Sequence, residues 1–248
     1  MENHSKRMAS RPRRRGRPGA RPRPADRPAP AAKAYDRAYF DRWYRDPGMA
    51  VIQREHLARR VRLAVAAAEW VLDRPVESVL DIGCGEGSWQ PALRRLRPRA
   101  GYLGLDPSAY AVERFGRRRG LVQGGVGDLA TAAFRRELAR RGMRPPFDLV
   151  VCCDVLHYVP TPELARGLGV IARLVGGGGL AYLEFFTRED ATEGDDEGFV
   201  PRAAATYARM FRAAGLTHLG LHAYVVKPAM GRELMRFEQG WAARPGTT

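Results

Sequence analysis

The chain has 248 residues, of which 45% are hydrophobic, and a formal net charge of +15, so it has enough apolar content for one domain with a sizeable core. No apolar run approaches the roughly 18 residues of a membrane-spanning helix, and the basic N-terminus is not followed by the apolar stretch of a secretory signal, so we expect a cytoplasmic protein. The three cysteines, Cys84, Cys152 and Cys153, form no C-x-x-C pattern, which argues against a disulfide framework and a zinc site and predicts buried thiols.

Most of the positive charge lies in the N-terminal segment. Residues 1–33 hold eleven Lys or Arg against Glu2 and Asp26, a net charge of +9, which leaves +6 for residues 34–248. The same segment holds six of the 18 prolines and almost no large apolar residue, so it cannot bury a core and is predicted to be disordered. It is either a solvated extension or an electrostatic arm for nucleic acid, a membrane or an acidic partner.

A cluster of aromatic residues follows this tail. Five aromatic side chains fall within ten residues, among charges: Tyr35, Tyr39, Phe40, Trp43 and Tyr44. The segment either packs on the body of the domain or forms an aromatic lid over a ligand cleft. A longer helix is predicted from about residue 50 to residue 73, with apolar side chains three and four residues apart, and Pro75 ends it. We therefore assign residues 34–75 to a helical lid or cover and residues 76–248 to an α/β core.

The stretch VLDIGCGEGSW, residues 79–89, is the strongest signal for a ligand site. The apolar run over residues 78–82 predicts a buried parallel strand, and three glycines at alternate positions separate it from a helix over residues 89–97. These glycines are Gly83, Gly85 and Gly87. Glycine allows positive φ and lets a ligand lie against bare backbone, and the free N–H groups at the helix start favour anionic or polar groups of a ligand.

Strands and helices then alternate along the chain. Predicted strands cover residues 101–105, 121–124, 147–153 and 180–186, and between them lie predicted helices that end at Gly120, Gly142 and Gly176. Asp128 is predicted to begin the second of these helices and Thr161 to cap the third. This alternation predicts a doubly wound, mostly parallel sheet of seven strands with helices on both faces. A helix over residues 201–214, one long strand over 216–226 and a last strand over 233–238 predict an antiparallel C-terminal edge.

The residues around the glycines narrow the choice of ligand. A phosphate-binding P-loop needs Lys and Ser or Thr after its last glycine, but Ser88 and Trp89 follow Gly87, which excludes that site. A dinucleotide site has the pattern G-x-G-x-x-G/A, and Ser88 stands at its sixth position, so NAD is disfavoured but not excluded. Asp106 comes 19 residues after Gly87, at the end of the next predicted strand, where a carboxylate can accept both hydroxyls of a ribose. These residues predict a nucleoside ligand.

Two further aspartates lie near the predicted strand ends. Asp128, in VGDL after the third strand, is placed either to bind the exocyclic amine of adenine or to act as a plain N-cap. Asp81 would be a carboxylate in a buried strand, and it therefore needs a partner, which a cationic group of a ligand would supply.

Five motifs resemble, in order and spacing, those of class I S-adenosylmethionine-dependent methyltransferases: VLDIGCGEGSW, LGLDPS, VGDL, FDLVVCCDVLHYV and the glycine turn before LAYLEFF. The resemblance spans about residues 78–186 and implies a Rossmann-like sheet with the first strand central and the last strand antiparallel. It also implies S-adenosylmethionine as the cofactor. The implied cofactor-binding residues are Asp81, Gly83, Cys84, Gly85 and Gly87 around the methionine portion, Asp106 on the ribose, Asp128 near adenine, and Asp154 and Val155 beside the reactive methyl group. Pro107 and Leu129 complete the expected cofactor-binding set.

Methyl transfer from a sulfonium depends mainly on orientation, which contributes up to about 7–11 kcal/mol in well-aligned systems. If the acceptor is a hydroxyl or an ammonium, a base contributes about 10²–10⁴-fold, and His157 is the first candidate, with Tyr158 next. Glu184 and His222 are further candidates, and each of these side chains could instead only pack or cap. On the predicted strand His218 and His222 would lie about 13 Å apart, so no metal site is expected.

Two classes of acceptor stay open. The first is a small molecule that takes the methyl group on an O or N atom; the second is RNA or protein, docked by the basic tail. The stretch CDVLHYV lacks the Asn/Asp-Pro-Pro-aromatic signature that amino-directed nucleic-acid methyltransferases of this family commonly carry, which favours the small molecule. A non-catalytic nucleoside-binding protein is a third possibility. The acidic run EGDDE, residues 193–197, is predicted to be a solvated loop, a prediction that a basic substrate would reverse. We expect no membrane partner, and the sequence does not indicate the oligomeric state.

Overall fold

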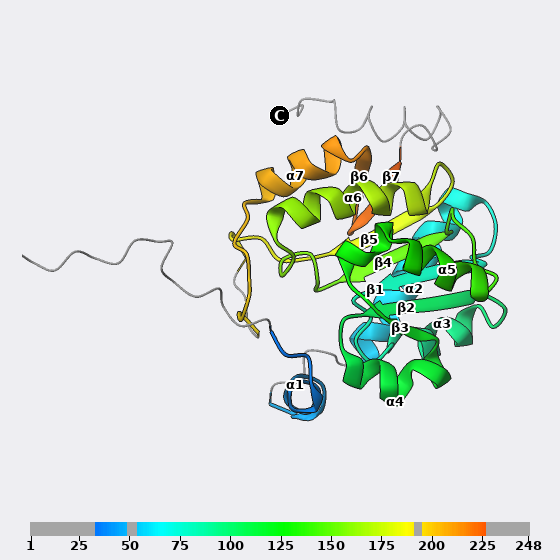
Figure 1. Cartoon of the computed structure of the whole chain (residues 1–248). Coiled ribbons are helices and arrows are strands. Elements are labelled where there is room, and N and C mark those ends of the chain that lie inside the picture. Colours follow the sequence, from blue (N-terminus) through cyan, green and yellow to red (C-terminus); the bar gives the residue numbers. More distant parts are fainter. Residues whose placement is uncertain (1–32, 49–53, 191–194, 227–248) are drawn as a thin grey trace, which may run out of the picture. The chain divides into compact units, whose positions relative to one another are not determined.

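A seven-stranded β-sheet runs through the centre of the computed structural model, which describes residues 33–48, 54–190 and 195–226 (Figure 1). Its strands are β1 (Ser78–Ile82), β2 (Gly101–Asp106), β3 (Leu121–Gln123), β4 (Leu149–Cys153), β5 (Leu180–Glu184), β6 (Leu216–Gly220) and β7 (Ala223–Val226). They lie in the order β3-β2-β1-β4-β5-β7-β6, and β1 to β5 pair in parallel. β7 is antiparallel to both of its neighbours. The predicted fold class is confirmed: β1 lies inside the sheet, next to the middle strand β4, and the antiparallel last strand β7 lies one position inside the edge strand β6.

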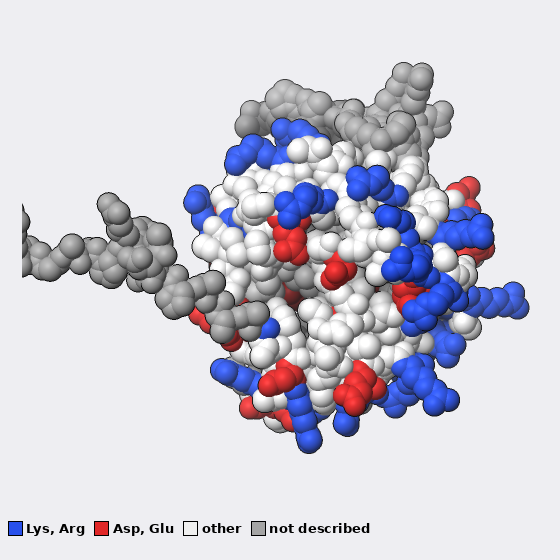
Figure 2. Space-filling view, in the orientation of Figure 1, with Lys and Arg blue, Asp and Glu red and all other residues white. Residues whose placement is uncertain are grey.

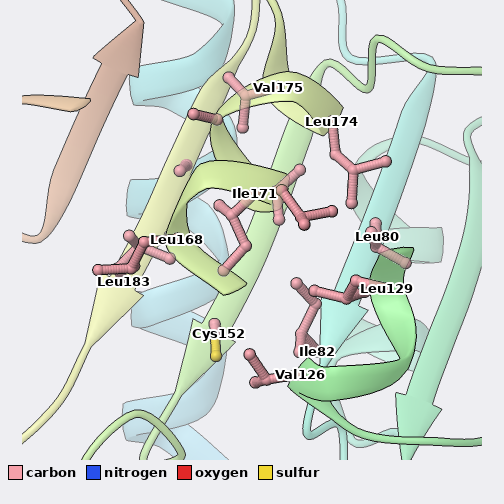
Figure 3. Packing of buried hydrophobic residues seen from close by; sticks show 14 of the residues in the cluster. Leu80, Ile82, Val126, Leu129, Cys152, Leu168, Ile171, Leu174, Val175 and Leu183 are labelled. Atoms are coloured by element: carbon pink, nitrogen blue, oxygen red, sulfur yellow. The ribbon is translucent and has the colours of Figure 1, made fainter. Parts of the chain in front are cut away.

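Helices cover both faces of the sheet. One face packs against α5 (Ala132–Arg140), α6 (Thr161–Val175) and α7 (Ala204–Ala213), and the other packs against α2 (Arg54–Leu72), α3 (Trp89–Leu96) and α4 (Ala109–Arg119). Successive side chains of β1 point to opposite faces, so Leu80 and Ile82 lie in the cluster under α6, whereas Val79 lies in the cluster with α2 (Figure 3). Each such buried side chain contributes about 1.5–3 kcal/mol, which fixes the register of the strand that leads into the glycine loop. None of the helices in the described ranges is long and apolar enough to cross a membrane.

Three local predictions are wrong. The expected single strand over residues 216–226 is a hairpin, because Leu221 and His222 adopt φ values of 48° and 64° and turn the chain between β6 and β7. The expected helix from Asp128 is a 3₁₀ turn, η3 (Val126–Ala130), followed by α5, whose N-cap is Thr131. Thr161 is the first residue of α6 and not its cap, because Pro160 holds the cap position. The predicted strand over residues 233–238 lies outside the described residues, as does the predicted tail apart from Lys33.

A buried carboxylate fastens β4 to the chain entering β1. Asp148 is only 6% exposed, and it accepts from both terminal nitrogens of Arg74 at 2.6 and 3.0 Å and from the amides of Glu77 and Ser78 at 2.7 and 3.2 Å. Asp148→Ala is expected to lower the free energy of unfolding by about 1–3 kcal/mol, because it leaves buried donors without their acceptor. Urea unfolding followed by circular dichroism measures this loss. Asp148→Asn keeps one acceptor oxygen and should lose less; equal stability of all three proteins would contradict the role of the carboxylate.

Candidate functional site

The glycine loop after β1 closes against the end of β2. The amides of Gly83 and Cys84 both donate to the carbonyl of Leu105, at 2.7 and 3.1 Å. Asp106, the last residue of β2, accepts from the amide of Gly85 at 2.6 Å. Neighbouring parallel strands bring these segments together, so the loop and the predicted ribose carboxylate form one unit.

Four amides of this loop are already used inside the chain. Gly87 donates to the carbonyl of Cys84 at 2.8 Å, so Gly83, Cys84, Gly85 and Gly87 all have partners for their N–H groups. The free N–H groups predicted from the sequence are those of the helix start, which begins at Trp89, and these four residues precede it. A loop that binds a pyrophosphate presents such amides to its ligand. This loop therefore suits a neutral or cationic group better than a phosphate.

Two of the glycines are required by close neighbours as well as by backbone conformation. Gly83 has a φ of 70°, and a Cβ there would overlap Cγ2 of Val155. Gly85 has a φ of 55°, and a Cβ there would overlap the hydroxyl of Tyr44. Both positions therefore exclude side chains, which keeps bare backbone on the wall of the site.

The glycine loop forms one wall of a cavity of about 500 Å³, a size typical of small-molecule sites. Ten of the thirteen residues proposed from the sequence line this cavity: Asp81, Gly83, Cys84, Gly85, Asp106, Pro107, Asp154, Val155, His157 and Tyr158. They come from the carboxyl ends of β1, β2 and β4, which meet at one edge of the parallel sheet. The structure thus brings most of the proposed residues together.

The remaining three proposed residues lie away from the cavity. Gly87 faces Leu121 and Arg119. Leu129 is 3% exposed and belongs to the hydrophobic core (Figure 3). Asp128 is exposed, and its carboxylate accepts from the amide of Gly125 at 2.8 Å within η3. Asp128 is thus the third residue of the turn and not its N-cap, which is Gly125, and its role near adenine stays a prediction.

Asp81 has a partner that the sequence did not indicate. The hydroxyl of Tyr102, from the neighbouring strand β2, donates to its carboxylate at 2.6 Å. Burial raises the pKa of Asp81 to about 7, although this hydrogen bond lowers it. Burial also raises the pKa of Asp106 to about 6, against the effect of the amides of Ser108 and Gly85. Both carboxyls therefore change charge close to neutral pH. Tyr102 could have been found only from the register of β1 on β2, which puts it on the same face as Asp81.

An ion-pair cluster lies at the ends of β4 and β5. Arg60, from α2, donates to the carboxylate of Glu184 at 2.8 Å and lies 3.5 Å from that of Asp154. Burial raises the pKa of both carboxyls, and Arg60 opposes the rise. Asp154 also has a φ of 59°, a conformation that side chains other than glycine rarely adopt and that clusters at functional sites. No sequence signal marked Arg60, which lies 124 residues before Glu184.

His157 lies in the cavity wall and is only 2% exposed. Its Nδ1 accepts from the amide of Phe186 at 3.2 Å, so in the neutral ring the proton sits on Nε2. Burial, with the nearby charge of Lys33, lowers the pKa of His157 to about 4. The ring is therefore neutral at physiological pH and offers an N–H donor at Nε2. This geometry differs from that of the general base expected from the sequence.

The N-terminal segment, residues 33–48, covers part of the cavity. It contains α1 (Arg37–Phe40) and a π-helical turn, η2 (Asp41–Arg45), and all five of its aromatic residues line the cavity. Arg45 forms an ion pair with Glu86 in the glycine loop. The hydroxyl of Ser108, which follows β2, donates to the carbonyl of Tyr35 at 2.5 Å. The segment is thus tied to the same two loops that carry the predicted cofactor residues.

The cavity wall is acidic although the whole chain is basic. Six carboxylates line it: Asp81, Asp106, Asp154, Glu163, Glu184 and Asp195. Arg60 is the one Lys or Arg among the described lining residues. In Figure 2, acidic side chains border the hollow on the face shown, while most Lys and Arg lie further out. This distribution attracts a cationic ligand and repels a phosphate.

Comparisons with known proteins agree with this geometry. A family model described as a methyltransferase domain matches residues 80–181. The ubiquinone biosynthesis O-methyltransferase of Xylella fastidiosa strain M23 is 28% identical over 182 residues, which cover 69% of this chain and 67% of the relative. The family-model match, this relative and the fold together support a class I S-adenosylmethionine-dependent methyltransferase.

Solved structures show that the methyltransferase has the fold of this family. Streptomyces venezuelae DesVI aligns with a TM-score of 0.52 at 17% identity, covering 70% of this chain and 93% of that one. An S-adenosylmethionine-dependent methyltransferase from Clostridium acetobutylicum also aligns with a TM-score of 0.52, at 14% identity, covering 74% and 87%.

S-adenosylmethionine, the cofactor of the methyltransferase, fits the residues that are present. The carboxylates of Asp81 and Asp106 suit an ammonium or sulfonium and a ribose, and Gly83 and Gly85 line the same cavity without side chains. Among the described residues, no group of three or more His, Cys, Asp or Glu side chains is arranged to hold a metal ion.

The affinity of the methyltransferase for S-adenosylmethionine is expected to depend on pH through Asp81. As the pH falls through its pKa of about 7, the carboxylate becomes neutral and loses its attraction for the cationic cofactor. Calorimetry should find binding about tenfold weaker at about pH 6 than at about pH 8, because roughly a tenth of the group is ionised one unit below its pKa. Asp81→Asn should reduce this pH dependence to the part that Asp106 contributes, because the pKa of Asp106 is raised to about 6. An unchanged pH dependence in that variant would contradict the assignment.

Proposed function

We propose that the methyltransferase transfers the methyl group to an O or N atom of a small polar molecule bound in the same cavity, beside His157 and Tyr158. The observation that carries the proposal is the cavity itself, about 500 Å³ in volume, partly covered by residues 33–48 and lined by polar groups at its wall. Such dimensions suit a cofactor with a small acceptor better than an extended polymer. The curated relatives, named for ubiquinone biosynthesis, support an acceptor of low molecular weight.

The residues of this site would act mainly by orientation. When bound, S-adenosylmethionine supplies a methyl group on a sulfonium sulfur, so an acceptor lone pair forms the new bond to carbon while the electron pair of the broken C–S bond stays on sulfur. Holding the acceptor in line contributes up to about 7–11 kcal/mol. A proton on the acceptor atom must leave, and Glu184 or Asp154, whose pKa values burial raises, are suited to receive it.

His157 has the role of a donor in this proposal. Its Nε2–H would hold the acceptor, while the Phe186 amide fixes the orientation of the ring through Nδ1. Tyr158 is held differently: its hydroxyl donates to the carbonyl of Asp195 at 2.6 Å, and burial raises its pKa well above its ordinary value. Tyr158 therefore keeps its hydroxyl uncharged and is poorly suited to act as a base. In this proposal its ring forms part of the cavity wall beside the acceptor.

Replacing His157 tests this role. His157→Ala is expected to lower kcat/KM about 10²-fold, the scale of a misplaced reacting group, and His157→Gln, which keeps an N–H donor, should recover part of the loss. The pKa of His157 is lowered to about 4, whereas the ordinary pKa of histidine is about 6.5. At saturating cofactor, a plot of kcat against pH should therefore show no change near pH 6.5 that is due to His157. A change of kcat near pH 6.5 that is absent from the His157→Ala variant would contradict the donor role and would support His157 as a general base.

The alternative acceptors are less well supported. RNA or protein docking rests on the basic tail, which lies outside the described residues apart from Lys33, so the docking arm stays a prediction. The cytoplasmic location and the absence of a membrane partner stay predictions as well. The intact cofactor residues argue against the non-catalytic alternative.

A labelling experiment separates the acceptor classes. The unaltered protein is incubated with tritiated methyl donor and with separate metabolite, RNA and protein fractions of cells, and the label incorporated in each fraction is counted. The proposal expects label in the metabolite fraction, and less of it when Asp106→Ala replaces the unaltered protein at a cofactor concentration that does not saturate the variant. Label confined to RNA or protein would overturn it.

A further inference from the structure

The ammonium group of Lys33 lies in a cage of aromatic rings and oxygen atoms at the wall of the cavity. Its Nζ is 4.1 Å from the ring centroid of Tyr158, 5.4 Å from that of Tyr39 and 5.6 Å from that of Tyr35. It also forms an ion pair with the carboxylate of Asp195 and donates to the carbonyl of Glu197 at 2.9 Å. Lys33 and Asp195 are each about one-tenth exposed. Aromatic faces combined with a carboxylate are the arrangement by which proteins recognise alkylammonium groups.

The cage is held together by contacts that do not involve Lys33. The hydroxyl of Tyr158 donates to the carbonyl of Asp195 at 2.6 Å, which fixes one wall to the loop after β5. The rings of Tyr35 and Tyr39 pack edge to face, with centroids 5.1 Å apart. The hydrogen bond from Ser108 to the carbonyl of Tyr35 ties this second wall to the end of β2. The walls would therefore keep their positions if another ammonium took the place of Lys33.

The cage also belongs to the cavity that holds the acceptor. Tyr35, Tyr39, Tyr158 and Asp195 all line that cavity, and Tyr158 directly follows His157 in the chain. Lys33 itself is not among the lining residues. An acceptor that lies beside His157 therefore meets the same rings and the same carboxylate that hold the lysine.

We propose that Tyr35, Tyr39, Tyr158 and Asp195 form a recognition site for an ammonium group of the methyl acceptor, and that Lys33 occupies this site in the absence of acceptor. The proposal rests on the proposed function, because it assumes that a small acceptor enters the cavity. The substrate class is accordingly a small amine-bearing molecule. A protonated ammonium has no lone pair, so it orients the molecule, and the methyl group goes to a different O or N atom of the acceptor.

Lys33 acts in this account as a competing ligand. It is part of the same chain, so its effective concentration at the cage is on the order of millimolar and must be overcome by the acceptor. Removing the lysine should therefore strengthen the binding of external ammonium ions, whereas a lysine that only fastened the segment would leave no such site when removed.

The test uses tetramethylammonium, a permanent cation that cannot accept a methyl group, and tert-butanol as its neutral counterpart of similar shape. Both are titrated by calorimetry, at ionic strength matched with sodium chloride, into the full-length protein saturated with S-adenosylhomocysteine. Lys33→Ala is expected to bind tetramethylammonium at least tenfold more tightly than the unaltered protein does, and more tightly than it binds tert-butanol. Adding Asp195→Asn to Lys33→Ala should remove at least tenfold of that affinity.

Three outcomes would overturn the inference: no tetramethylammonium binding by Lys33→Ala, equal binding of cation and alcohol, or no effect of Asp195→Asn. Each would show that the Lys33 contacts only fasten residues 33–48. Titration of S-adenosylmethionine into the same variants, before the cation is added, separates this failure from others. If the cofactor binds and the cation does not, the ammonium site is wrong and the proposed methyl transfer stands; if the unaltered protein binds no cofactor, the proposed function itself fails.

Discussion

Replacing Asp106 with alanine is expected to weaken S-adenosylmethionine binding at least tenfold. The carboxylate accepts from the amides of Gly85 and Ser108, at 2.6 and 2.9 Å, and its two oxygens have further lone pairs for the ribose hydroxyls. Each hydrogen bond to a charged group contributes about 1.5–3 kcal/mol, and about 1.4 kcal/mol is a factor of ten. The variant loses such bonds to the ligand and also releases the glycine loop. Isothermal calorimetry measures the affinity directly.

Two variants control this experiment. Asp106→Asn keeps the size and one acceptor oxygen, so it should lose less affinity than the alanine variant. Asp128→Ala removes another carboxylate that follows a strand, but this side chain is exposed and accepts from the amide of Gly125 instead of lining the cavity, so its effect should be smaller than that of Asp106→Ala. If Asp128→Ala loses more affinity than Asp106→Ala, the assignment of the nucleoside end of the site is wrong.

Gly85→Val is expected to reduce S-adenosylmethionine affinity still further, by about 10²-fold or more. The residue has a φ of 55°, and its Cβ would overlap the hydroxyl of Tyr44 in the segment that covers the loop. The strained backbone costs about 1–3 kcal/mol, and the overpacking costs about 1–3 kcal/mol more. Either the loop or Tyr44 must move to relieve this clash, and both line the cavity.

Gly142→Val provides a matched control for backbone strain. Gly142 has a similar φ of 66°, but a Cβ there meets nothing within 4 Å, and it does not line the cavity. This variant should lose stability in urea unfolding while keeping its affinity for S-adenosylmethionine. Equal loss of affinity in both variants would mean that Gly85 acts only through global stability.

The sequence predicts the parts of this protein that depend on neighbouring residues. The apolar run before Gly83 makes a buried strand, and the spacing from the glycines to Asp106 places the carboxylate at the end of the next strand. Parallel strands end at one edge of a sheet, so the sequence also predicts that Asp154 and His157 reach the same cavity. For these residues, the local sequence pattern and the general topology of a parallel sheet are sufficient to predict where they lie.

The contacts that the sequence did not predict join residues that are distant in the chain. Tyr102 meets Asp81 across 21 residues, Arg60 meets Glu184 across 124, and Lys33 meets Asp195 across 162. Such contacts require the strand register and the path of the N-terminal segment, which no periodicity encodes. The protonation of His157 was missed for the same reason, because the amide that fixes its tautomer belongs to Phe186, 29 residues later.

The hairpin between β6 and β7 was missed for a different reason. Tight hairpin turns are usually signalled by Asn-Gly or Asp-Gly, because their central residues need positive φ. Here Leu221 and His222 adopt positive φ values without that signal, and the alternation of apolar residues continues across them. A single long strand is therefore the natural expectation from the pattern.

The central claim is that the acidic cavity over the glycine loop binds a cationic nucleoside cofactor. The most direct measurement titrates S-adenosylmethionine and, separately, NAD into the unaltered full-length protein by isothermal calorimetry at neutral pH. The account predicts saturable binding of S-adenosylmethionine at one site and no measurable binding of NAD, because the four loop amides are already paired and six carboxylates repel a pyrophosphate. Binding of NAD in place of S-adenosylmethionine would contradict it.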